Sequence, residues 1–104
     1  MATTRLETLK SMLARNPLDS FARYGLALEY RTAGDLDSAI AEFEALMSAA
    51  PDYVPAYYQA GQTLERRGRP EEAREVYRRG LEAAARKGDA HARGEIEAAL
   101  DLLG

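Results

Sequence analysis

The sequence predicts an all-α protein, a right-handed α-solenoid of antiparallel helix pairs with about six helices. Two observations carry this prediction: an internal repeat, and apolar residues spaced three and four positions apart within each copy of it. The chain has 104 residues, of which 46% are hydrophobic. That is enough for one continuous core and too few for two, so we expect a single domain over residues 1–104.

The repeat divides the middle of the chain into blocks 20–53 and 54–87. Gly34 recurs as Gly68, Ala39 as Ala73 and Phe43 as Tyr77, each 34 positions further on. Each block is predicted to hold two helices, at 20–33 and 36–49 in the first and at 54–67 and 70–86 in the second. The second helix of the first block shows one apolar stripe, made of Ala39, Ile40, Phe43, Leu46 and Met47.

Helix start and stop signals support these bounds. Gly34 and Gly68 permit the left-handed turn that ends a helix. Asp35 then suits an N-cap, and Pro70 suits a first helical position. The second block has no closing proline, because Ala85 stands there, so its second helix is expected to continue to residue 86 or 87.

One further helix is expected on each side of the two blocks. Residues 3–15 match the second helix of a repeat, with Leu9 one period before Phe43. We interpret them as an N-terminal half-repeat. At the other end, Gly88 and Asp89 form a stop and an N-cap, and residues 89–103 are expected to be a C-terminal capping helix.

These landmarks resemble the tetratricopeptide repeat (TPR) family, and the whole chain is similar to short stand-alone bacterial TPR proteins of unassigned function. The first block keeps Leu26, Ala27, Tyr30, Ala39, Phe43 and Pro51, and the second keeps Tyr57, Gly61, Ala73, Tyr77 and Gly80. Arg23 stands where the family usually has tryptophan. The small residues among these are expected to let helices approach closely, and the aromatic rings to fill the core.

The resemblance implies a concave surface made by the first helix of each pair. Carried onto this chain, the groove residues are Tyr24, Leu28, Arg31, Tyr58, Gln59, Gln62, Glu65 and Arg66. We expect a non-catalytic protein-protein interaction module, an adaptor that binds a peptide segment of another protein there. Two alternatives remain open: Tyr24 and Tyr58 lie at the helix seam, or the chain is a structural self-associating module. The dimer of such a module would use the same groove or the exposed Leu102. For the chain itself we expect a monomer or weak homodimer.

The family's two-carboxylate clamp for acidic C-termini is not predicted here. The clamp needs asparagine at the positions that Gly25 and Gln59 occupy. Arg31 and Arg66 still offer bidentate donors to a carboxylate, so an acidic peptide remains compatible with the sequence.

Composition and spacing disfavour other functions. With no cysteine and with His91 as the single histidine, the sequence predicts no metal site, no cofactor and no catalytic grouping, and hence no enzyme. The arginines of residues 66–79 alternate with glutamates, and the spacing of Glu75 and Arg79 predicts an ion pair between them. We therefore expect no nucleic-acid partner. Charges at Arg5, Lys10 and Arg15 exclude an N-terminal secretory or membrane segment, which predicts a cytoplasmic protein with no membrane contact.

Overall fold

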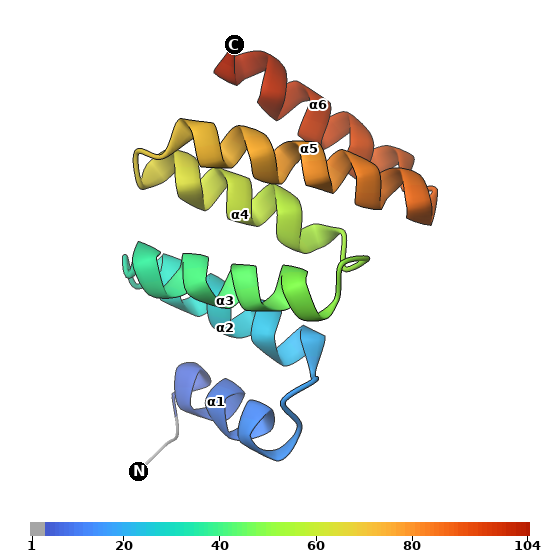
Figure 1. The fold of residues 1–104 in the computed structure, drawn as a ribbon. Coiled ribbons are helices and arrows are strands. Elements are labelled where there is room, and N and C mark those ends of the chain that lie inside the picture. Colours follow the sequence, from blue (N-terminus) through green and yellow to red (C-terminus); the bar gives the residue numbers. More distant parts are fainter. Residues whose placement is uncertain (1–3) are drawn as a thin grey trace.

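The computed structural model describes residues 4–104 as six α-helices connected by short turns (Figure 1). They are α1 (Arg5–Arg15), α2 (Ser20–Thr32), α3 (Leu36–Ala49), α4 (Pro55–Arg66), α5 (Pro70–Lys87) and α6 (Ala90–Leu103). The all-α prediction is confirmed, and the helix ends agree with it to within one residue apart from the start of the first helix. That start was predicted at residue 3, which lies outside the described residues.

Start and stop signals explain these bounds, and all of them except Asp19 are among those that the sequence predicts. The carboxylates of Asp19, Asp35 and Asp89 each accept a hydrogen bond from the backbone N–H three residues on, and so cap α2, α3 and α6. At the other ends, Gly34 and Gly68 both have a φ of 83°, a left-handed conformation that favours glycine. These five residues set the start or the end of α2, α3, α4 and α6.

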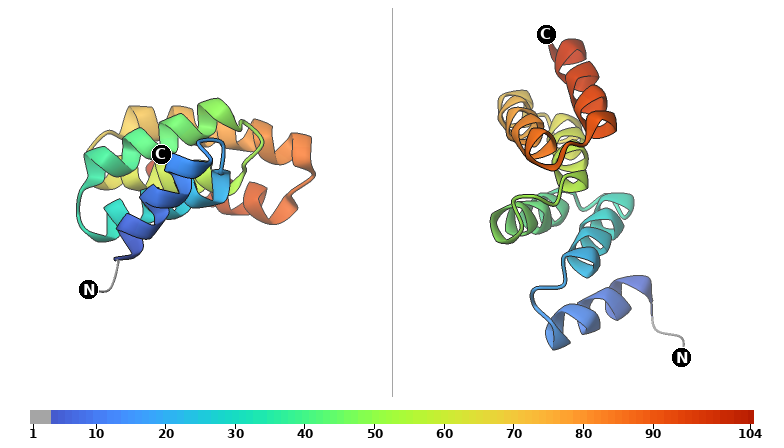
Figure 2. Two further views of the ribbon diagram at one scale, coloured as in Figure 1. Left: turned by 90° about the horizontal axis from the view of Figure 1, so that it is seen from below. Right: turned by 90° about the vertical axis from the view of Figure 1, so that its right-hand side faces the viewer.

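The helices stack into an elongated body of 47 × 29 × 19 Å. Helix α2 packs against α3 and α4 against α5, while α3 contacts α4 and α5 contacts α6. In the right panel of Figure 2, α2, α4 and α6 lie on one side of the stack, and α3 and α5 lie on the other. Helix α1 covers the free end of the stack by packing on α2, with Leu9 buried against Ala22 and Leu26. This is a TPR-like solenoid, as predicted.

Small residues let large rings fill the core between the helices. Ala27, Ala39 and Ala73 are fully buried, as are the rings of Phe43 and Tyr77. The ring of Tyr77 occupies the space that a side chain at position 61 would take, because a Cβ added to Gly61 would lie 2.1 Å from its Cε1 atom. The expected packing role of these residues is therefore confirmed.

The arginines of residues 66–79 do not all pair as their spacing suggests. Glu75 pairs with Arg78, at 3.8 Å, rather than with the predicted partner Arg79. Arg79 lies over the ring of Tyr57 instead, with its guanidinium carbon 5.8 Å from the ring centroid. A cation–π contact with a buried tyrosine thus replaces a surface ion pair that would contribute little to the stability of the fold.

No helix within residues 4–104 has the length and the apolar character that crossing a membrane requires.

Two glycine-to-alanine substitutions test this packing with opposite expected signs. At Gly61 the added methyl collides with the Tyr77 ring, so the free energy of unfolding should fall by about 1–3 kcal/mol. At Gly94, on the exposed side of α6, nothing lies within 4 Å of the added Cβ. There the same change should raise stability by about 0.5–1 kcal/mol, because alanine favours the helix. Urea denaturation of the two variants measures both values, and equal effects would show that the α4–α5 packing is wrong.

Candidate functional site

Helices α2, α4 and α6 form one side of the stack (Figure 2), which we call the concave face because the family resemblance implies that it is concave. Seven of the eight predicted groove residues are half-buried, and Arg66 is exposed. They lie in order along α2 and α4, with Tyr24 and Tyr58 near the start of their helices and Arg31 and Arg66 in the last turns. Half-burial means that each of the seven side chains contacts the fold on one side and remains accessible on the other.

Tyr24 and Tyr58 both belong to the helix seam and to the accessible face. The ring of Tyr24 lies 5.5 Å from that of Tyr53 and 6.3 Å from that of Phe43, while Tyr58 lies 6.5 Å from Tyr77. Burial raises the pKa of Tyr24. One side of each ring therefore supports the core, and the side that remains lines a cavity.

This cavity, which we call the tyrosine cavity, has a volume of about 170 Å³ and lies where α2, α4 and the start of α6 meet. Its lining comprises Tyr24 from α2, Val54, Pro55, Tyr58 and Gln59 from α4 and its cap, and Asp89, His91, Ala92 and Glu95 from α6 and its cap. The sequence analysis assigned no groove residue to α6. The capping helix departs from the 34-residue pattern, so the repeat alone does not show that it completes this cavity.

A hydrogen-bonded cluster behind the groove connects two predicted groove residues to the core. The Tyr77 hydroxyl donates to Glu65 Oε2 at 2.5 Å and accepts from Gln62 Nε2 at 2.6 Å. Burial, followed by the hydrogen bond to Glu65, strongly raises the pKa of Tyr77. Gln62 and Glu65 therefore have a structural role in addition to their predicted position on the groove.

Arg31 and Arg66 form a positively charged end of the concave face. Arg31 Nη1 donates a hydrogen bond to Gln59 Oε1, and burial together with the charge of Arg66 lowers the pKa of Arg31. Within residues 4–104 neither arginine forms a salt bridge, whereas Arg67 and Arg69 pair with carboxylates. Neither guanidinium group therefore has a carboxylate partner among these residues.

Phe21 is an exposed aromatic residue that the sequence analysis did not include. It is 68% exposed and lies three positions before Tyr24, hence on the same face of α2. The stripe on this face runs through Phe21, Tyr24, Leu28 and Arg31. Extending the helical spacing one turn back from Tyr24 would have found it.

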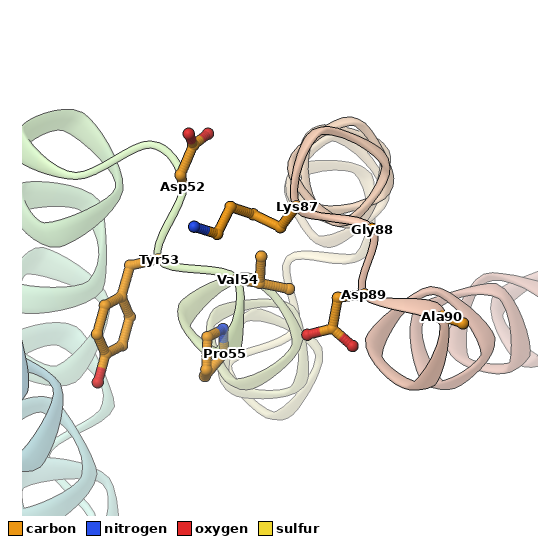
Figure 3. Close-up of a pocket in the computed structure, with 8 residues that line it drawn as sticks. All are labelled: Asp52, Tyr53, Val54, Pro55, Lys87, Gly88, Asp89 and Ala90. Carbon is orange, nitrogen blue, oxygen red and sulfur yellow. The ribbon is translucent and has the colours of Figure 1, made fainter.

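A second and wider hollow of about 610 Å³ borders the tyrosine cavity (Figure 3). It lies between the α3–α4 and α5–α6 connections, and Val54, Pro55 and Asp89 line both spaces. Figure 3 shows the Asp89 carboxylate pointing toward Pro55 at the start of α4, and the Tyr53 ring pointing away toward α2. Among residues 4–104, no three or more histidine, aspartate or glutamate side chains come close enough together to hold a metal ion.

Stacked antiparallel helix pairs with a 34-residue period and one concave face define a helical-repeat protein. The particular family follows from comparison with known proteins. The chain belongs to the tetratricopeptide repeat family, whose model matches residues 30–100. It is 30% identical over 98 residues to the TPR repeat-containing protein PA0015 of Pseudomonas aeruginosa, a match that covers 94% of this chain and 93% of that one.

Solved structures resemble the chain closely. A TPR domain protein from Salinibacter ruber has 35% identity and a TM-score of 0.77, over 82% of this chain and 94% of that one. Protein BPP2914 from Bordetella parapertussis has 28% identity and a TM-score of 0.83, over 98% and 89%. The type III secretion translocator chaperone SycD of Yersinia enterocolitica shares the fold at 17% identity, with a TM-score of 0.86 over 94% and 68%. TPR folds generally serve as protein–protein interaction modules.

The Tyr77 cluster predicts how stability responds to alkali. Below pH 10, the ordinary pKa of tyrosine, the phenol is protonated in both folded and unfolded chains and contributes no pH dependence. Above pH 10 the unfolded chain releases this proton while the folded chain retains it. The free energy of unfolding should therefore fall with rising pH, by at most about 1.4 kcal/mol per unit from this group.

The matched variant is Tyr77→Phe, which keeps the ring and removes the titrating hydroxyl. Its unfolding free energy should decline less steeply above pH 10, although not become flat, because the pKa values of Tyr24, Tyr53 and Tyr57 are also raised. Urea denaturation from pH 8 to 11 measures both slopes. Identical slopes would mean that Tyr77 does not have the raised pKa.

Proposed function

We propose that this chain is a non-catalytic adaptor that binds a segment of another protein along its concave face. The observation that carries the proposal is the accessible stripe on α2, where exposed Phe21 continues into half-buried Tyr24 and Leu28, opposite Tyr58 across the tyrosine cavity. Membership of a family of interaction modules supports the same reading.

The chemistry of the stripe suits a peptide rather than a small metabolite. Aromatic rings backed by the core supply apolar contact area at a low cost in side-chain entropy, and their hydroxyls offer hydrogen bonds at the edge. The Cα atoms of Arg31 and Arg66 lie about 10–12 Å further along their helices, since seven or eight residues separate them from Tyr24 and Tyr58, and the Arg31 guanidinium reaches back to Gln59 at the cavity. A segment of a few residues spans this distance, whereas a small ligand would fill only one part.

Phe21 and Leu102 form a matched pair of variants for testing this proposal. Both side chains are largely exposed, at 68% and 90%, so changing either to serine should alter the free energy of unfolding by no more than about 0.5 kcal/mol. Peptides selected against the wild-type protein from a random display library supply the ligand. For these peptides Phe21→Ser should weaken binding about tenfold, as for an interface anchor worth about 1.4 kcal/mol, and Leu102→Ser should leave it unchanged.

The alternative of self-association is tested with the same variants. Sedimentation should show a wild-type monomer whose concave face is free. If the wild-type protein is instead a stable homodimer that Phe21→Ser or Leu102→Ser dissociates, the chain is a self-associating module rather than an adaptor. If Phe21→Ser leaves the peptide affinities unchanged, the peptides do not bind on the concave face.

A further inference from the structure

The tyrosine cavity is of a size to take one side chain. Its volume of about 170 Å³ equals that of roughly six waters at about 30 Å³ each. Two tyrosine rings form part of its wall, and their outer ends open onto the concave face. A long, unbranched side chain with a polar end fits such a space, because its methylenes contact the rings while its end remains near solvent.

The side chains that line the cavity include two carboxylates, those of Asp89 and Glu95. Asp89 accepts the backbone N–H of Ala92 at 3.0 Å, and its carboxylate points toward the start of α4, which has no side-chain cap of its own (Figure 3). Its charge thus offsets the positive N-terminal ends of α4 and α6. Glu95 is different: it is exposed, and no hydrogen bond or salt bridge engages it within residues 4–104. It therefore has no ion-pair partner there, and Arg31, whose charge also acts on Tyr24, donates to Gln59 instead.

Other tyrosines of the chain show what such rings accept. Lys10 Nζ lies 5.7 Å from the ring centroid of Tyr30, and the Arg79 guanidinium lies 5.8 Å from that of Tyr57. No cation of the described chain covers Tyr24 or Tyr58 in this way. Two tyrosine rings whose faces no cation covers, beside a carboxylate without an ion-pair partner, form a complementary site for a positive charge.

We propose that the tyrosine cavity receives a lysine or arginine side chain of the bound segment, with its methylene stem against Tyr24 and Tyr58 and its cationic end at Glu95. This deepens the proposed function and rests on it. The other acidic or basic residues of the lining are Asp89, a helix cap, and His91, and the Arg31 guanidinium lies behind Gln59. The basic residue is thus the part of the partner that lies nearest to α6.

Capped amino acids test the cavity without any knowledge of the partner. The probes are N-acetyl lysine methylamide, its norleucine analogue, which lacks the ammonium group, and its glutamate analogue. In nuclear magnetic resonance titrations of the ¹⁵N-labelled protein, lysine should shift the amide signals of Tyr58, Ala92 and Glu95. It should bind about fivefold more tightly than norleucine, as for roughly 1 kcal/mol of charge recognition, and glutamate should bind least. Equal affinities for lysine and norleucine, or a preference for glutamate, would overturn the proposal.

Glu95→Gln and Glu97→Gln are matched variants, because both side chains are exposed and both belong to α6. Glu95→Gln should abolish the preference for lysine over norleucine, and Glu97→Gln should keep it, because Glu97 pairs with Arg93 away from the cavity. The same variants are then measured with peptides selected from the library. The selected peptides can bind the concave face without a basic residue and without any response to Glu95→Gln. That result rejects this inference but not the proposed adaptor function. Peptide binding that Phe21→Ser leaves unchanged rejects the adaptor instead.

Discussion

The structure depends on the close contact between Gly61 of α4 and the Tyr77 ring of α5. The ring is fully buried and lies where any side chain at position 61 would be. This contact sets how closely α4 and α5 approach each other. A second contact, at Gly80 of α5, sets how closely α6 approaches α5. There a Cβ on Gly80 would lie 2.6 Å from Tyr57 Cβ and 2.9 Å from Ile96 Cδ1. Glycines thus determine the spacing of three consecutive helices, and with it the width of the concave face.

The same tyrosine connects the core to the proposed binding surface. Its hydroxyl holds Gln62 and Glu65 in place, and its ring supports Tyr58 from behind. Tyr24 is supported in the same manner by Phe43 and Tyr53. Core contacts therefore hold these four side chains in place, which would lower the entropic cost of the proposed binding. It also means that truncating Tyr24 or Tyr58 removes seam contacts as well as groove contacts, so exposed Phe21 is a cleaner probe.

The repeat period and the helix caps made the fold predictable from the sequence. Gly34, Gly68 and Gly88 end helices and Asp19, Asp35 and Asp89 begin them, and each of these effects is local. The site was less predictable because it depends on contacts between helices. The partners of Gln62, Glu65 and Arg79 come from side-chain geometry across a seam, and the 34-residue spacing does not encode them. The cavity needs α6, whose sequence departs from the pattern just where His91 and Glu95 contribute.

Charge is distributed unevenly along the concave face. Arg31 and Arg66 lie in the last turns of α2 and α4, and Glu95 and Asp89 lie beside the first turns of α4 and α6. Helix dipoles favour cations at the former end and carboxylates at the latter, so part of this arrangement stabilises the fold itself. The charges that intramolecular pairs leave uncompensated are those of the two arginines and of Glu95. A partner with a basic residue at one end and an acidic residue at the other would match them.

Amide hydrogen exchange with and without a selected peptide tests the central claim, that one face made by α2, α4 and α6 binds a partner segment. Exchange should slow in the first turns of α4 and α6 and along α2, with the helices on the opposite side, α3 and α5, unchanged. Protection confined to α3 and to α5, the helix that carries Arg74, Arg78 and Arg79, would place binding on the convex side and contradict the account.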